Sequence, residues 1–127
     1  MKRQVAKWVR KAEEDWEGAR DMAARTPPLR DLACFHCQQT AEKYLKALLQ
    51  EKGSVVPKTH DLQDLLDLLL PHDKTLAGLR RGLGSLSRYA VDYRYPGIRA
   101  TSRRMEAALR RTDHLRSQIR IRLGLPP

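Results

Sequence analysis

Residues that could bind a phosphate group and exchange protons are concentrated between positions 88 and 97. This stretch holds three of the four tyrosines, two arginines and one aspartate, and it ends in a Pro-Gly pair. Arginine binds phosphate through its planar fork of N–H donors, and tyrosine and aspartate can exchange protons with a bound ligand. We therefore predict a functional centre that contains Arg88, Asp92, Tyr93, Arg94 and Tyr95.

The net positive charge of the chain comes almost entirely from its second half. Residues 1–70 carry 12 Lys and Arg against 11 Asp and Glu, whereas residues 71–127 carry 13 against 4, and 12 of those 13 cations are arginine. This excess favours a nucleic-acid or nucleotide partner over a neutral small molecule, with an ordinary solvated basic surface as the alternative. The candidate phosphate-binding residues are Arg88, Arg94, Arg103 and Arg110.

The elements that must position these residues are helices. Apolar residues recur at helical spacing over about residues 2–25, 30–52, 61–70, 74–93 and 101–123, and no segment alternates as a strand would. Short connections between long helices predict an all-α, antiparallel up-and-down bundle of four to five helices, in one domain of residues 1–127. No apolar run has the length of a membrane span and no signal-peptide pattern is present, so we expect a cytoplasmic protein.

The spacing also predicts which face of each long helix is buried. On the first helix the expected core residues are Val5, Trp8, Ala12, Ala19 and Met22; on the second they are Cys34, Ala41, Leu45, Leu48 and Leu49. Asp15 falls at the edge of the first face, where it reaches solvent or meets an arginine of another helix. Gln38 falls in the middle of the second face, where it bonds the backbone or lines a site, and His36 points away from that face.

Most familiar catalytic and metal-binding motifs are absent. The sequence has no glycine-rich phosphate loop and no plausible set of metal ligands, so we expect neither a metal nor a cofactor. Cys34 and Cys37 fit packing thiols better than half of a zinc site. Thr59, His60 and Asp61 suit the capping of a helix better than catalysis, and a helix-turn-helix is disfavoured because its recognition helix would be rich in leucine and acidic residues.

Three segments of the chain resemble the HEPN domain family, the higher eukaryotes and prokaryotes nucleotide-binding domain. They are Phe35-His-Cys-Gln-Gln-Thr-Ala-Glu-Lys-Tyr-Leu-Lys-Ala-Leu-Leu49, Thr59-His-Asp-Leu62 and the stretch from Tyr89 to Gly97. The resemblance covers nearly the whole chain. It implies a bundle that pairs as a homodimer and is commonly encoded beside a minimal nucleotidyltransferase, as a toxin and antitoxin pair of the HepT-like type.

The resemblance also implies a ribonuclease motif, and this chain departs from it. Many HEPN proteins are metal-independent RNases that use an Arg, four to six further residues and a His, and the toxin branch adds a Tyr two positions later. Here Arg88 takes the arginine position, Tyr93 replaces the His, and Tyr95 matches the tyrosine to which the partner attaches AMP. Because the phenol, unlike imidazole, is almost wholly protonated at neutral pH, we expect weak or no RNase activity.

Three functions remain open at this point. The first is an interaction module, a homodimer that binds a nucleotidyltransferase and also nucleotide or RNA, with a degenerate motif. The second is an RNase that uses Arg88 with Tyr93, Asp92 or His36 in place of the usual His. The third is a domain that binds ATP or AMP for a partner's adenylyl transfer, through Arg88, Arg94 and the basic last helix.

Overall fold

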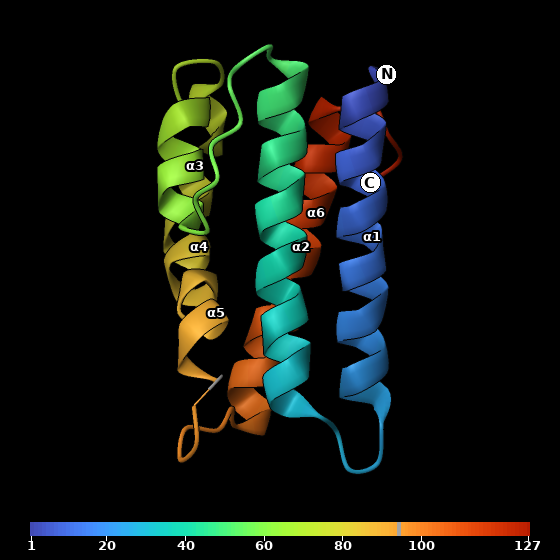
Figure 1. Cartoon of the computed structure of the whole chain (residues 1–127), viewed down its shortest axis with the longest axis vertical. Helices are drawn as coiled ribbons and strands as arrows, with labels where there is room; N and C mark the ends of the chain where they lie inside the picture. Colours follow the sequence, from blue (N-terminus) through green and yellow to red (C-terminus); the bar gives the residue numbers. More distant parts are fainter. Residues whose placement is uncertain (94) are drawn as a thin grey trace.

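The computed structural model describes residues 1–93 and 95–127, with the side chains of all of these except Ala90 and Val91. The predicted all-α bundle is confirmed, and the described residues form no strand. Three long helices, α1 (Arg3–Ala24), α2 (Arg30–Glu51) and α6 (Ser102–Arg122), lie beside a column of shorter ones (Figure 1). The column consists of α3 (Leu62–Leu69), the 3₁₀ helix η1 (Lys74–Leu79), α4 (Arg80–Ser87) and α5 (Tyr89–Asp92). None of the described helices is both long and apolar enough to span a bilayer.

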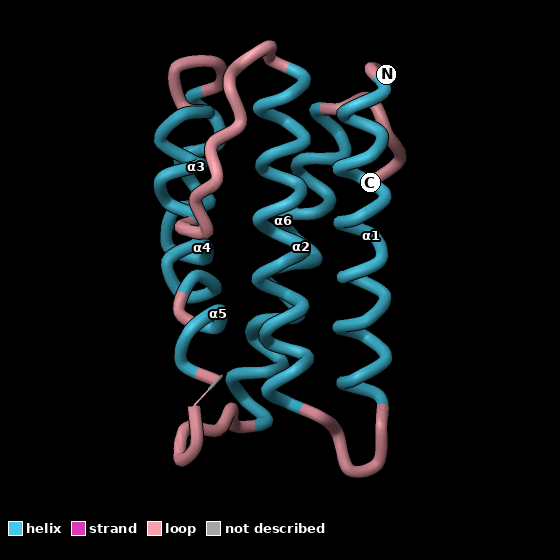
Figure 2. The backbone as a smooth tube through the Cα atoms, in the orientation of Figure 1, coloured by secondary structure: helices cyan, strands magenta, loops and turns pink. Residues whose placement is uncertain are grey.

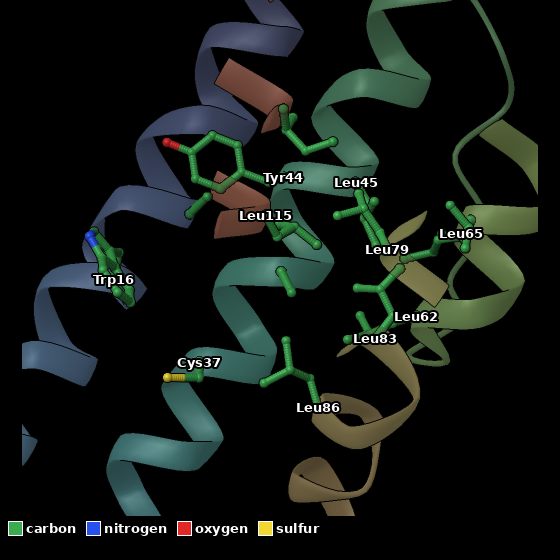
Figure 3. Packing of buried hydrophobic residues seen from close by; sticks show 14 of the residues in the cluster. Trp16, Cys37, Tyr44, Leu45, Leu62, Leu65, Leu79, Leu83, Leu86 and Leu115 are labelled. Atoms are coloured by element: carbon green, nitrogen blue, oxygen red, sulfur yellow. The ribbon is translucent and has the colours of Figure 1, made fainter. Parts of the chain in front are cut away.

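Helix α2 is the centre of the bundle. It packs against α1 and α6 on one side and against α3, α4 and α5 on the other, as the backbone trace in Figure 2 shows. The predicted face of α2 is confirmed as buried, but burial extends much further around the helix, to Cys37, Thr40, Tyr44 and Ala47. Figure 3 shows Cys37 and Tyr44 of α2 directed towards the α1 side, and Leu45 towards the leucines of the α3–α4 column. A helix enclosed on this many sides must satisfy its polar side chains internally.

Three buried polar residues of α2, Gln38, Glu42 and Lys46, meet this requirement through one network. Glu42 accepts a hydrogen bond from the Lys46 ammonium at 3.1 Å and lies 3.0 Å from Nδ1 of His60. Gln38 donates to the backbone carbonyl of His60 at 3.1 Å, so its predicted role as a core amide bound to the backbone is confirmed. Through these contacts the loop before α3 is fixed to α2.

Thr59, His60 and Asp61 serve that loop and the start of α3. The backbone N–H of Asp61 donates to the Thr59 hydroxyl, and the Asp61 carboxylate accepts from the backbone N–H groups of Gln63 and Asp64. These are the interactions of a helix N-cap, and they satisfy donors that a helix end otherwise leaves free. The capping interpretation of this tripeptide is therefore confirmed.

The buried face of α1 differs in part from the prediction. Val5, Ala12 and Ala19 are buried as expected, but Val9 and Trp16 complete the stripe. The predicted core residues Trp8 and Met22 lie at its edge and are only partly buried. Trp8 is useful there because the Lys46 ammonium lies 5.7 Å from the centre of its ring, a favourable cation–π contact for a nearly buried amine.

The predicted helix over residues 74–93 is wrong as a single element. The chain forms η1, α4 and α5 in succession, although Leu79, Leu83 and Leu86 are buried as the spacing predicts. Three glycines at 78, 82 and 84 weaken the helical preference of this segment. Gly84 faces α3, where a Cβ would lie 2.8 Å from the amide nitrogen at the end of the flexible Gln63 side chain, which would have to move.

Helix α6 buries one stripe of core residues, and its polar edge is fixed to α1 by one carboxylate. These core residues are Met105, Ala108, Thr112, Leu115 and Ile119. Arg116 donates to both oxygens of Glu13 at 2.7 and 2.6 Å, and the Tyr44 hydroxyl donates to Glu13 at 2.6 Å. Burial alone would raise the pKa of Glu13, but the hydrogen bonds from Arg116 and Tyr44 outweigh it and hold that pKa below its ordinary value.

We predict that Glu13→Gln lowers the free energy of unfolding by about 1 kcal/mol at neutral pH, since it removes charged hydrogen bonds to a half-exposed group. A carboxylate whose pKa is lower in the folded state stabilises the protein above its unfolded-state pKa, and this contribution disappears as the pH falls through the folded-state value. The difference between the variant and the parent in urea denaturation should therefore shrink in acid. The exposed neighbour Glu14→Gln is the matched control; an equal loss in both variants would contradict this account.

Candidate functional site

Arg88 lies at the point where α4 gives way to α5, and its side chain is exposed. The hydroxyl of the preceding Ser87 accepts a hydrogen bond from the backbone N–H of Leu62 at 3.0 Å, which ties the end of α4 to the start of α3. The backbone stays helical at Arg88 (φ −64°, ψ −29°), and its carbonyl accepts from the N–H of Asp92 at 2.9 Å. Arg88 therefore has a hydrogen-bonded helical backbone and an exposed guanidinium that a ligand can reach.

Tyr93 is less exposed than Arg88, because its ring packs against the core. It stacks on Tyr89 with 5.2 Å between ring centres and 25° between planes, and it is only partly exposed against the core. Burial raises the pKa of Tyr93, and a hydrogen bond with Arg104 opposes but does not cancel that effect. A phenol with a raised pKa is a poorer source of a proton acceptor at neutral pH than an ordinary tyrosine.

Tyr95 lies beyond α5 in the loop that leads to α6, with 62% of its surface exposed. The loop reverses at Gly97, whose φ of +87° is a conformation that favours glycine. It is anchored where the backbone N–H of Ala100 donates to the Asp31 carboxylate at 2.7 Å. Tyr95 is thus accessible on a loop with a fixed end, and this loop between α5 and α6 lies at the lower end of the bundle in Figure 1.

Of the predicted phosphate-binding arginines, Arg110 lines a groove between α1 and α6 whose described lining includes neither Arg88 nor Arg103. Arg103 and Arg110 of α6 are exposed, as expected. Arg110 lies with Trp16 and Arg20 on the α1 side of α6, whereas Arg111 lines the opposite groove, beside Gly82 of α4. Arg94 lies outside the described residues, so its predicted role is not addressed by the structure.

Neither Asp92 nor His36 forms a described contact with Arg88 that would replace the histidine of the RNase motif. No ion pair joins the described side chains of Asp92 and Arg88, although their spacing would allow one. His36 does not point freely outward as predicted: it contacts α1, where its Nδ1 lies 2.9 Å from the Asp15 carboxylate. Asp15 accordingly pairs with His36 and Lys43 of α2, so neither predicted alternative, a solvent-exposed carboxylate or a pair with an arginine, describes it.

Two members of the site were not foreseen from the sequence. Tyr89 forms the platform under Tyr93, and the i, i+4 spacing of the two tyrosines was the signal that could have indicated it. Arg104 of α6 acts on the Tyr93 hydroxyl and lowers its pKa against the effect of burial. The two residues are only eleven positions apart, but they lie on either side of the turn that follows α5, and spacing within one helix does not relate them.

The two cysteines are unsuited to metal or redox chemistry. Both are fully buried free thiols, and burial raises the pKa of each to about 12. Within the described residues no group of three or more His, Cys, Asp or Glu side chains could hold a metal ion. Cys34 and Cys37 therefore act as packing groups in α2.

Comparisons with known proteins agree with this fold. A family model described as the HEPN domain matches residues 5–121. The structure is similar to that of TT1696 from Thermus thermophilus, with a TM-score of 0.82 and 26% identity over 94% of this chain and 98% of that one. It is also similar to ST0689, an archaeal HEPN homologue, with a TM-score of 0.74 and 28% identity over 96% and 98% of the two chains. A search of curated proteins gives no match.

We predict that neither cysteine reacts with a thiol-alkylating reagent at neutral pH while the protein is folded, because both are buried and protonated. In denaturant both should react. Mass spectrometry of the intact protein measures the number of labels directly. Rapid labelling of either thiol in the native protein would show that α2 is less enclosed than described.

Proposed function

Because the chain belongs to the HEPN domain family, we propose that it works as an interaction module: the HEPN half of a prokaryotic toxin-antitoxin pair whose other half is a minimal nucleotidyltransferase. In this proposal the protein is a homodimer that binds its partner and also contacts RNA or nucleotide, without efficient RNA cleavage. The observation that carries it is the position of Tyr93, where a HEPN RNase has its histidine.

The environment of Tyr93 supports the loss of catalysis. RNA cleavage through the 2′-hydroxyl requires a group that accepts a proton near neutral pH. Tyr93 is stacked on Tyr89, and burial raises its pKa further from neutrality. A residue in this setting holds the α5 turn against the core better than it exchanges protons.

The alternative of an RNase built on Arg88 has no imidazole base among the described side chains. His36 is bound to Asp15, His60 to Glu42 and His72 to Ser54, and His114 lines the groove between α4 and α6. No described hydrogen bond joins any of these four imidazoles to Arg88 or Tyr93. Arg88 alone can bind a phosphate and stabilise its charge, which favours RNA or nucleotide binding over cleavage.

The exposure of Tyr95 supports modification by the partner. In the proposed step the Tyr95 hydroxyl loses its proton and attacks the α-phosphorus of ATP, and pyrophosphate leaves, so that AMP becomes attached to the ring oxygen. With 62% of its surface exposed, Tyr95 can enter another protein's active site, whereas the stacked Tyr93 cannot without unpacking. A nucleotide-binding accessory role in a partner's adenylyl transfer, through Arg88, Arg94 and the basic last helix, is the second alternative.

We predict that co-expression with the nucleotidyltransferase encoded beside this gene gives a stable complex. Size-exclusion chromatography with light scattering measures its mass, and the HEPN chain alone should elute as a homodimer. Recovery of free HEPN dimer only, with a folded and soluble nucleotidyltransferase in the same extract, would contradict the proposed function.

We further predict that incubation with this nucleotidyltransferase and ATP adds the mass of one or more AMP groups, and that Tyr95→Phe abolishes the addition. Tyr93→Phe is the matched control, because it removes the other site hydroxyl but keeps the ring stack. Intact-mass spectrometry followed by peptide mapping provides the measurement. Addition that persists in Tyr95→Phe would refute the assignment of this tyrosine.

A further inference from the structure

A groove between α1 and α6 is not used by the function proposed above. It has a volume of about 480 Å³. Its lining residues are Trp16, Arg20, Leu109, Arg110, Asp113 and Arg116. Half of these side chains are arginines, and they come from two helices that are far apart in the sequence. The groove is separate from the Arg88 centre, which lies at the junction of α4 and α5.

Arg116 binds the Glu13 carboxylate with one edge of its guanidinium and can bind a second anion with another edge. Its Nε and Nη2 donate to the two oxygens of Glu13 at 2.7 and 2.6 Å, which fixes the plane of the group. A guanidinium has five N–H donors, and this pairing engages only the Nε–Nη2 edge. Among the described residues no carboxylate pairs with the Nη1 edge, so an anion can bind there without breaking the contact that holds α6 to α1.

Arg20 of α1 and Arg110 of α6 are the other two arginines that line the groove. The Arg20 guanidinium lies 5.5 Å from the centre of the Trp16 ring, a cation–π contact that orients it over an indole that is only 6% exposed. Arg110 is exposed on the opposite wall, and no described carboxylate forms an ion pair with either arginine. Arginine, with its flat fork, is better suited than lysine to bind a phosphate through two donors.

Asp113 limits which anions this groove should prefer. Its exposed carboxylate lies among the lining residues, where it repels a bare anion. The same carboxylate accepts hydrogen bonds from a hydroxyl or amino group. A ligand that carries such donors beside its phosphate satisfies both the arginines and Asp113, whereas inorganic phosphate satisfies only the arginines.

We propose that the α1–α6 groove is a second ligand site, distinct from the Arg88 centre, which binds the phosphate of a nucleotide through Arg20, Arg110 and Arg116 and a hydroxyl or amino group of the same nucleotide through Asp113. The nucleotide is either free or part of an RNA strand. The site stands on its own residues, so it holds whether or not Tyr95 is modified or a nucleotidyltransferase binds.

Tryptophan fluorescence can report binding in this groove. The chain has two tryptophans, and Trp8→Phe leaves Trp16, directly beneath Arg20, as the only indole. This protein is titrated with AMP, with inorganic phosphate and with a short single-stranded RNA. We expect saturable changes with AMP or the RNA, and weaker binding of phosphate alone; comparison of AMP with the RNA identifies the source of the nucleotide.

Substitutions in the same background test the residues. We expect Arg110→Glu to weaken nucleotide binding about tenfold or more, because it replaces a charge-assisted donor by a repelling carboxylate. Arg20→Glu should do the same, and Arg110 provides the safer variant because it has no described packing role. Arg10→Glu is the matched control: it makes the same charge change at an exposed position of α1 outside the groove.

Asp113→Asn separates a nucleotide site from a general anion site. The substitution should strengthen inorganic phosphate binding by removing repulsion, and it should improve AMP binding less or weaken it. Equal affinity in Arg110→Glu and Arg10→Glu, or no change of Trp16 fluorescence with any of the three ligands, would overturn the proposal. Loss of binding in Arg88→Ala with Arg110→Glu unaffected would also overturn it, and would place the nucleotide at the Arg88 centre.

Discussion

The enclosure of α2 is the constraint on which the rest of the structure depends. This helix contacts α1, α6 and the column of shorter helices, so its polar residues must find partners inside the bundle. Glu42, Lys46 and Gln38 do so with each other and with His60, and the Lys46 ammonium also lies over the Trp8 ring. Because a buried charge is costly unless it is paired, this network fixes both the register of α2 and the path of the loop before α3.

The arrangement of Arg88, Tyr93 and Tyr95 depends on how the chain continues after α4. Helix α4 ends at Ser87, which is bonded to the start of α3, and α5 adds one turn whose Tyr89 ring is buried. Tyr93 stacks on Tyr89 and turns inward, while Arg88 and Tyr95 remain at the surface. Packing therefore leaves Arg88 and Tyr95 exposed and Tyr93 partly buried.

Much of this architecture could be predicted from the sequence, because helical spacing reports burial directly. The core residues of α6, the bounds of α2 and the cap at Asp61 all follow from local rules. The division of residues 74–93 into three elements and the contacts of His36 and Arg104 did not, since they depend on how neighbouring elements pack, which the spacing within one helix does not report. For the same reason the groove formed by Arg20 and Arg110 emerges only when α1 and α6 are placed side by side.

We propose that one imidazole separates this site from an RNase site, and the variant Tyr93→His tests that proposal. Metal-free incubation of transfer RNA with a large excess of protein is the measurement. We expect intact RNA with the parent chain, cleavage with Tyr93→His, and no cleavage when Arg88→Ala is added to Tyr93→His. Cleavage by the parent chain that disappears in Arg88→Ala would contradict the account, because it would show that the site already has a working base.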